Sequence, residues 1–213
     1  MKKIILVSAA ALGFLGVNAF ANMGNAFTKG IYVGLQAGYD MNAWGNVSNP
    51  DNRAFFGTYI SQENGFAGRV LGGWDFHPNF AVEMGYFRAF NKPVSMITGS
   101  DWWRYTTQGF DLMGKMKYAF DDNFGVYAKF GLDYLLTQID PQGTNTTISG
   151  YSVDNFNIAY GLGFGYEVAQ NLTLDVSWTR FQGKSKVDGD QLQPRYQEAI
   201  DFFALGLVYR FNL

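Results

Sequence analysis

The residues of this chain that could do chemistry are charged side chains set into short, alternating apolar segments. Five basic and six acidic residues fall on the same side of that alternation, so their charges nearly balance. Such a set could form an ion path or proton relay, or a structural lattice of salt bridges. The balance favours the lattice, because a buried charge is costly unless it is paired. The set comprises Arg69, Lys115, Lys117, Lys129, Arg210, Asp75, Glu83, Asp111, Asp133, Glu167 and Asp175.

Four residues of this set are expected to lie at the same level along the barrel axis. Glu83, Lys115, Lys129 and Asp175 each lie about four to six positions from the nearest predicted tight turn. Strand stagger in a barrel blurs such a count, but the count places them in one interior layer, with Arg69 near the middle. We therefore predict an interior charge network of Arg69, Glu83, Lys115, Lys129 and Asp175.

Residues for catalysis are sparse. Acyl transfer or ester hydrolysis ordinarily uses a Ser nucleophile and a base, usually His, and the only histidine is His77, beside Pro78 in a predicted turn. Ser185 lies between two lysines in a predicted loop without a pocket, and the acidic run 188–190 is too sparse for a calcium loop. With no cysteine either, the sequence predicts no catalytic residue, no metal site and no cofactor. A lipid A-modifying enzyme is the less favoured alternative.

Alternation with period two, which marks strands with two different faces, predicts the elements that position the charges. One face is large and apolar in segment after segment, and the other is Gly, Ala, Ser, Thr and charge. A narrow barrel needs small residues inside it, so a lipid-facing apolar side and a lumen-facing polar side explain both faces. We predict an all-β fold, an eight-stranded antiparallel transmembrane β-barrel. Its strands are expected at 31–38, 66–76, 80–87, 110–120, 126–134, 156–167, 172–179 and 202–211.

The connections alternate in length. Three tight turns are expected at 77–79, 121–123 and 169–171, and four long connections at roughly 41–64, 89–105, 137–154 and 182–197. Short periplasmic turns and long extracellular loops are typical of outer-membrane barrels. This arrangement puts the N-terminus and the C-terminus of the barrel domain in the periplasm.

The composition and the N-terminus indicate export. A basic start, an apolar run from Ile4 to Val17 and the small-x-small pattern 19–21 are the layout of a signal peptide. We expect residues 1–21 to be cleaved and 22–213 to form one outer-membrane β-barrel domain. Aromatic residues make up 18% of the chain, and it has 26 glycines, as aromatic girdles and a tight lumen require. The net charge of −2 does not suggest nucleic acid. The expected location is the outer membrane of a Gram-negative bacterium.

Three segments resemble the OmpA-type transmembrane barrel, within the broader family of small outer-membrane barrels that includes opacity-type surface antigens. They are 81–86, 115–123 and 126–131. The resemblance implies an interior layer of alternating acids and bases, with Glu83, Lys115 and Lys129 at matching positions. Gly165 stands where an acid is often found in that family, so the network is expected to differ on that side.

The last predicted strand carries an assembly motif. It reads Gly-x-x-aromatic-x-aromatic, similar to the terminal signal that the barrel-insertion machinery recognises, although two more residues follow where such signals usually end on the aromatic residue. The similarity implies that Gly206, Tyr209 and Phe211 form the signal. It also implies the insertion machinery and periplasmic chaperones as partners during assembly.

The long loops are the remaining candidates for function. Trp102, Trp103 and Arg104 could contact lipopolysaccharide or a host surface molecule, since arginine and aromatic residues are good contact residues. Alternatively, they belong to the outer aromatic girdle. We expect an integral outer-membrane protein of structural or surface-interaction type, with a plugged lumen and with function carried by extracellular loops. The alternative is a porin-like protein, either a narrow channel or a hydrophobic-ligand conduit.

Overall fold

The computed structural model describes residues 30–43, 65–95, 102–141, 151–187, 195–197 and 199–211. Segment 1–21, the expected signal peptide, lies outside these residues, so its cleavage stays a prediction. Among the described residues, no helix has the length and hydropathy needed to cross a membrane.

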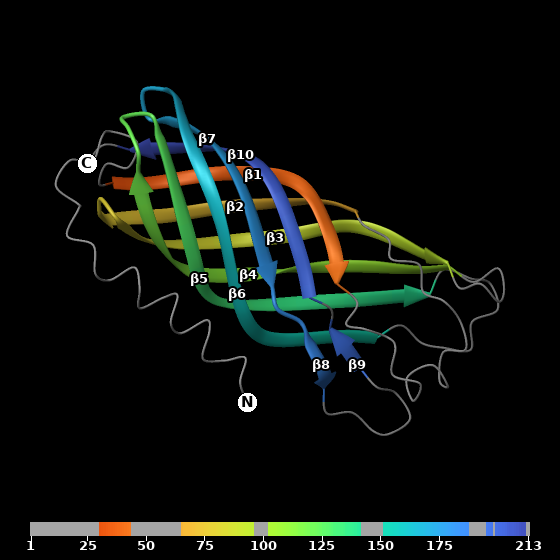
Figure 1. Cartoon of the computed structure of the whole chain (residues 1–213). Coiled ribbons are helices and arrows are strands. Elements are labelled where there is room, and N and C mark those ends of the chain that lie inside the picture. Colours follow the sequence, from red (N-terminus) through yellow and green to blue (C-terminus); the bar gives the residue numbers. More distant parts are fainter. Residues whose placement is uncertain are drawn as a thin grey trace.

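Eight strands close into an antiparallel barrel in which the last strand pairs with the first (Figure 1). The seam joins β1 and β10, from Ile31 opposite Phe211 to Ala43 opposite Ala199. The predicted eight-stranded antiparallel barrel is therefore confirmed. Its strands are β1 (Gly30–Ala43), β2 (Gly65–His77), β3 (Phe80–Ser95), β4 (Trp102–Ala119), β5 (Phe124–Pro141), β6 (Tyr151–Ala169), β7 (Leu172–Phe181) and β10 (Ala199–Phe211).

A small two-stranded sheet, not predicted from the sequence, lies in the last long connection. It pairs β8 (Lys184–Val187) with β9 (Arg195–Gln197) and is separate from the barrel sheet. Ser185, flanked by its two lysines, is therefore part of a strand and not of a loop.

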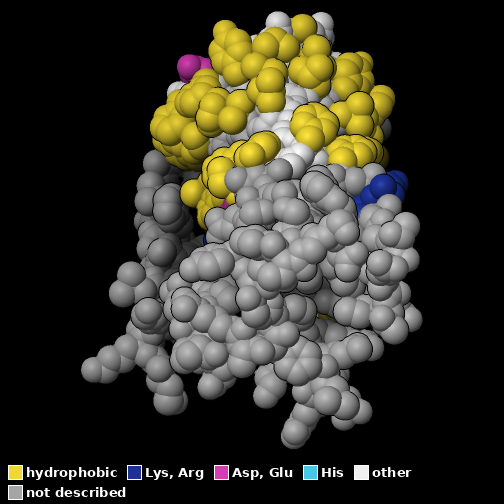
Figure 2. Space-filling view, turned by 90° about the vertical axis from the view of Figure 1, so that its right-hand side faces the viewer, with side chains coloured by type: hydrophobic (Ala, Val, Ile, Leu, Met, Phe, Trp, Pro, Cys, Tyr) yellow, Lys and Arg dark blue, Asp and Glu magenta, His cyan; other side chains and the backbone are white. Residues whose placement is uncertain are grey.

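Side chains alternate between the outside and the lumen along the barrel strands. In β1, Ile31, Val33 and Leu35 are 46%, 47% and 64% exposed, whereas Tyr32 and Gln36 are 2% and 5% exposed. Figure 2 shows hydrophobic side chains gathered on the outer wall, seen from the loop end. An exterior of large apolar residues around a polar interior is the reverse of a water-soluble protein. It fits a barrel whose outer face meets lipid.

Two belts of aromatic residues border the outer apolar face. The turn-end girdle comprises Trp74, Phe76, Phe80, Tyr118, Phe120, Phe164, Tyr166, Tyr209 and Phe211, and the loop-end girdle comprises Tyr39, Phe66, Tyr86, Phe90, Phe110, Tyr134, Phe156, Tyr160 and Trp178. Aliphatic residues such as Leu35, Met84 and Leu132 lie between them and are more than half exposed. Aromatic girdles at both interfaces are characteristic of transmembrane barrels. The two belts therefore mark the edges of the membrane-spanning zone.

Polar side chains on the outer face begin at the loop-end girdle. Three aromatic residues of this girdle each donate a hydrogen bond to a polar residue on a neighbouring strand: Tyr86 to Gln108 at 3.0 Å, Tyr134 to Asp154 at 2.8 Å and Trp178 to Asp201 at 3.0 Å. Tyr and Trp favour a membrane interface because each has an apolar ring and a polar edge. These bonds place the lipid headgroups at the level of the loop-end girdle.

All eight barrel strands are longer than predicted, and four of them carry the barrel wall past the loop-end girdle. The outer ends of β3, β4, β5 and β6 are Ser95, Trp102, Pro141 and Tyr151. The predicted connections 89–105 and 137–154 are therefore too long, because residues 89–95, 102–105, 137–141 and 151–154 are in strands. In these extensions the alternation of apolar and polar residues fades, because the outer face no longer meets lipid. Arg104 and Gln138, for example, are exposed on that face. The backbone pairing of the strands nevertheless continues. We call this extension, which reaches beyond β1 and β10 in Figure 1, the tall wall.

Glycines on the inner face let neighbouring strands bend closely past one another. A Cβ atom on Gly38 would overlap the backbone carbonyl of Phe203, and one on Gly109 would overlap that of Tyr134. Glycine accommodates such a close approach of two backbones, and glycine kinks supply the curvature that barrel closure needs. The glycine-rich inner face thus shapes the barrel wall as well as the lumen.

The closed sheet predicts a heat-modifiable protein. A barrel has no free edge, and its backbone hydrogen bonds stay paired within the sheet when detergent surrounds it. We therefore expect the unheated protein to migrate faster than the boiled protein in gel electrophoresis with sodium dodecyl sulfate. Identical mobility of the two samples, both extracted from membranes, would contradict the closed barrel.

Candidate functional site

Arg69 lies at the centre of a charge lattice inside the barrel. Its side chain extends from β2 into the lumen, and the residue is 1% exposed. The guanidinium donates two hydrogen bonds to the carboxylate of Asp111, at 2.8 and 2.5 Å, and another to Glu83 at 2.8 Å. A planar guanidinium suits bidentate pairing of this kind. The buried cation is therefore held between two carboxylates.

Glu83 on β3 collects further cations. Lys115 Nζ lies 3.4 Å and Lys129 Nζ 3.8 Å from its carboxylate oxygens, and the Tyr32 hydroxyl donates a hydrogen bond to it at 3.1 Å. Lys115 also lies over the ring of Tyr127, 3.7 Å from the ring centroid, in a cation–π contact. Glu83 is only 1% exposed, so these partners replace the water that would otherwise solvate its charge.

Asp175 on β7 joins the lattice through neutral side chains. Its two oxygens accept hydrogen bonds from Gln36 and Tyr127, both at 2.7 Å. Gln36 in turn accepts a hydrogen bond from Arg69 at 3.2 Å. The structure thus brings together the residues of the predicted network, although their functional role stays a prediction. We call Arg69, Glu83, Asp111, Lys115, Lys129, Asp175, Tyr32, Gln36 and Tyr127 the charge lattice.

Three large side chains of the lattice fit because a glycine stands beside each. A Cβ atom would overlap the Tyr32 ring if added to Gly73, the Arg69 guanidinium if added to Gly85, and the Tyr127 ring if added to Gly163. Tyr32 faces Gly73, and Tyr127 faces Gly163, in the strand register. The prediction from charge alone missed the neutral members of the lattice. A large polar residue opposite a glycine is the sequence signal that could have found the tyrosines.

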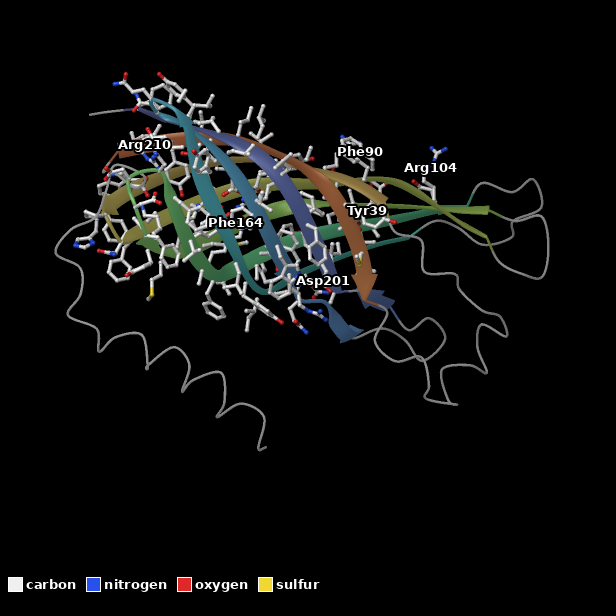
Figure 3. The ribbon with its side chains drawn as sticks, turned by 45° about the horizontal axis from the view of Figure 1, so that its top comes forward. Tyr39, Phe90, Arg104, Phe164, Asp201 and Arg210 are labelled. Atoms are coloured by element: carbon white, nitrogen blue, oxygen red, sulfur yellow. The ribbon has the colours of Figure 1, made fainter. Side chains whose placement is uncertain are left out.

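A second, smaller cluster lies nearer the tight turns. Asp75 of β2 forms ion pairs with Lys117 of β4 and with Arg210 of β10, the latter at 3.1 Å. Figure 3 shows Arg210 at the turn end of the barrel and Arg104 at the other end. A small cavity between this cluster and the charge lattice has room for about one water molecule. The turn end of the lumen is therefore nearly filled.

Two acids of the predicted inward set stand outside both clusters. The carboxylate of Glu167 is half-buried and accepts a hydrogen bond from the backbone amide of Asn171 at 3.3 Å, so Glu167 stabilises the turn between β6 and β7. Asn171 has a φ of 67°, in the left-handed region that Asn tolerates. Asp133 is 1% exposed and pairs with Asn157 of β6, a neutral residue, and not with a cation. The ion pairs therefore use fewer acids than the sequence count suggested.

An apolar layer fills the lumen on the loop side of the charge lattice. Phe87, Phe181 and Phe202 are completely buried, and the ring centroid of Phe87 lies 4.9 Å from that of Phe181 and 5.2 Å from that of Phe202. We call this layer the apolar plug; its other members are Ala67, Ala89, Met113, Leu135, Ala159, Ile200 and Ala204. It was not predicted, because an inward apolar residue does not stand out from its lipid-facing neighbours in an alternating pattern.

The predicted surface-contact residues lie on the tall wall. Arg104 is exposed on β4, and Figure 3 places it beyond Phe90 toward the long connections. Phe110, the residue that β4 contributes to the loop-end girdle, is six positions nearer the turn end than Arg104, or about 20 Å along an extended strand. The backbones of Trp102 and Trp103 belong to the same strand, while their side chains lie outside the described part of the structure. Contact of this segment with lipopolysaccharide or a host molecule stays a prediction.

The predicted assembly motif lies in the closing strand, β10. Tyr209 and Phe211 face lipid and are 45% and 46% exposed, with their rings edge to face at 5.0 Å. Gly206 lies opposite Gln36 of β1, where an added Cβ would come within 2.7 Å of the Gln36 side chain. The motif therefore lies at the seam where the barrel closes. Its recognition by the insertion machinery stays a prediction.

Catalytic and metal-binding groups are not assembled in the described part of the chain. His77 accepts a hydrogen bond from the backbone amide of Asn79 at 3.1 Å and lies against Phe80, which makes it a turn residue. Within the described ranges, no group of three or more His, Cys, Asp and Glu side chains could hold a metal ion. The described lumen side chains form paired charges and packed rings.

Solved structures of small outer-membrane barrels share this fold. OprG of Pseudomonas aeruginosa is 11% identical with a TM-score of 0.59, and the match covers 88% of this chain and 100% of that one. Neisserial surface protein A is 14% identical with a TM-score of 0.54, over 85% of this chain and 97% of that one. Ail, the attachment invasion locus protein of Yersinia pestis, is 11% identical with a TM-score of 0.51, over 85% and 99% of the two chains.

Sequence comparisons agree with these structural matches. An uncharacterised protein of Coxiella burnetii (strain RSA 493 / Nine Mile phase I) is 26% identical over 254 residues, which cover 99% of this chain and 100% of that protein. The sequence profile of a family described as the outer membrane protein beta-barrel domain matches residues 7–211. The chain therefore belongs to the outer membrane protein beta-barrel domain family and is an integral protein of the outer membrane.

Proposed function

We propose that this protein is a structural or surface-interaction platform of the outer membrane, with a lumen plugged by side chains and with function carried by its extracellular loops. The observation that carries the proposal is the stacking of two filled layers in the lumen, the charge lattice and, on its loop side, the apolar plug. The interior of an eight-stranded barrel is just wide enough for side chains to fill. A solute crossing the barrel would have to displace both layers.

A narrow channel or a hydrophobic-ligand conduit is the main rival function. A channel requires a polar path along the whole lumen, and the buried phenylalanines of the apolar plug interrupt such a path. A conduit requires an apolar pocket that opens at one mouth, whereas the plug residues are buried against one another. A lipid A-modifying role is not proposed, because His77 lies in a tight turn, and we expect the turns in the periplasm, away from lipid A.

The tall wall supports a role at the cell surface. It carries exposed polar residues, among them Arg104 and Gln138, past the headgroup level. Ail, which has the same fold, was crystallised with the heparin analogue sucrose octasulfate. For this chain we propose lipopolysaccharide and host surface molecules as contacts of the loops. The proposed partners during assembly are the barrel-insertion machinery and periplasmic chaperones.

We expect little or no steady conductance when the refolded protein is inserted into a planar lipid bilayer. The charge lattice and the apolar plug support this expectation, because water would have to pass both layers of buried side chains. A variant that combines Arg69→Ala with Phe87→Ala removes a large side chain from each layer, so its conductance should exceed that of the wild type if it refolds. A large, steady conductance of the wild-type barrel would overturn the plugged lumen and favour the channel.

The orientation of the barrel in the membrane can be tested on whole cells by labelling a single introduced cysteine. The chain itself contains no cysteine that would be labelled as well. A Gln138→Cys variant places a thiol on the tall wall, and an Asn123→Cys variant places one in a tight turn, both at exposed positions. We expect a membrane-impermeant maleimide to label the first variant on intact cells and the second only after the outer membrane is opened. The reverse pattern would invert the barrel in the membrane and move the proposed contact loops to the periplasm.

A further inference from the structure

Arg88 of β3 is a cation on the lipid-facing side of the barrel. The residue is exposed and forms no ion pair with any described residue. Its neighbours on the same face of β3 are Tyr86 and Phe90, both of the loop-end girdle. A charge on the lipid face destabilises a barrel least near the interface, so this position is compatible with folding. The guanidinium still lacks an anion.

Arg180 of β7 shows how an arginine at this level can be neutralised within the protein. Its guanidinium lies 2.8 Å from the carboxylate of Asp201. The positions opposite Arg88 are Gln108 on β4 and Gly68 on β2, and neither can neutralise it. Arg88 therefore presents a positive charge to the outer leaflet, where lipid headgroups carry phosphate.

The outer surface beside Arg88 has no side chain at Gly68, and we call this position the notch. A Cβ atom on Gly68 would meet no atom of another residue closer than 3.6 Å, so packing does not require glycine there. Phe66 and Phe90 stack with ring centroids 5.8 Å apart and close the notch on its loop side. Toward the middle of the membrane, the surface continues over Val70, which is 54% exposed. The surface around the notch is thus apolar, and Arg88 lies opposite Gly68 in the strand register.

We propose that Arg88 and this notch bind a phosphorylated lipid of the outer leaflet, with the lipid phosphate paired to the guanidinium and an acyl chain lying over Gly68 and Val70. A planar guanidinium matches phosphate through two parallel hydrogen bonds. The apolar floor of the notch matches a hydrocarbon chain, and the charge selects an anionic lipid over a neutral one. The site lies outside both the lumen and the loops, so it goes beyond the platform function; it rests only on the orientation proposed there, with the loop end of the barrel in the outer leaflet.

The test uses the refolded full-length barrel in detergent and lipid A carrying two phosphates as the probe, with bound lipid counted by native mass spectrometry. We expect Arg88→Ala to weaken binding about tenfold, because a hydrogen-bonded ion pair contributes enough for one decade in affinity. Arg88→Lys should retain part of the binding. Gly68→Leu should weaken lipid binding by filling the notch. Arg180→Ala is the matched control and should bind lipid A like the wild type.

Two further measurements distinguish binding of a lipid phosphate from binding of free inorganic phosphate. Lipid A without phosphates should bind about as weakly to the wild type as complete lipid A binds to Arg88→Ala. Inorganic phosphate in excess should not displace the lipid, since it cannot occupy the apolar notch. Equal binding by the wild type and Arg88→Ala, or by the two forms of lipid A, would overturn the proposal. Full displacement by inorganic phosphate would also overturn it. Gel mobility of unheated samples shows whether each variant has folded.

Discussion

Replacing Arg69 by alanine should lower the free energy of unfolding by about 3–5 kcal/mol, the cost of removing one partner from a buried ion pair. Arg69 is 1% exposed and donates hydrogen bonds to both Asp111 and Glu83. Without Arg69, the carboxylates of Asp111 and Glu83 stay in the lumen, and Asp111 loses its cationic partner. Urea titration of the barrel in lipid vesicles, followed by tryptophan fluorescence, measures the loss.

Lys115→Ala is the matched control inside the same lattice and should cost clearly less. Glu83 keeps Arg69 and Lys129 when Lys115 is removed, so no acid is stranded by that change. Replacing Lys115 and Glu83 together should cost less than the two single changes added, because residues in contact are not independent. Equal losses for Arg69→Ala and Lys115→Ala would show that Arg69 is not the centre of the lattice.

Phe87→Ala should destabilise the barrel by about 3–5 kcal/mol, the range for truncating a buried phenylalanine. Phe87 contacts both Phe181 and Phe202 in the apolar plug, and all three are completely buried. The surrounding wall is a closed sheet and cannot collapse into the space that the ring leaves. The same urea titration measures the effect, and bilayer conductance should stay near zero because the charge lattice remains.

Phe90→Ala provides the comparison on the other side of the wall. Phe90 is 50% exposed and stacks on Phe66 at the surface. Lipid can fill the space of a missing ring there, so no cavity remains and the loss should be smaller than for Phe87→Ala. If the two variants lose the same stability, Phe87 is not packed as the structure shows.

The alternation along each strand was enough to predict the barrel and the inward face of the eleven charged residues named from the sequence, but it missed Asp40, which is completely buried. Small residues on one face and large apolar residues on the other are physically required by a narrow lumen and by lipid. That pattern assigned Arg69, Glu83 and Lys115 to the interior correctly. It also predicted the positions of the tight turns, because the turns interrupt the alternation.

Contacts across the lumen could not be predicted in the same way. They depend on how far each strand is shifted against its neighbours and on the room that facing glycines leave, neither of which alternation encodes. Asp175 was expected among the cations, but it binds Gln36 and Tyr127. Phe87 faces inward in an alternating segment, yet only the three-dimensional arrangement shows that it meets Phe181 and Phe202.

The unequal height of the barrel wall bears on how copies of this protein coexist in a crowded membrane. Within the described residues, β2 pairs with β3 only as far as Ala89, whereas β3 continues to Ser95. Among the described residues, no strand pairs with that side of β3 there, and an unpaired sheet edge is a place where a strand from another molecule could add, the first step of edge-to-edge aggregation. This last stretch of β3 contains Lys92 and Pro93, a charge and a residue without an amide hydrogen, which natural proteins place on edges to prevent such addition. We expect these two residues to disfavour the addition of a strand from a neighbouring barrel.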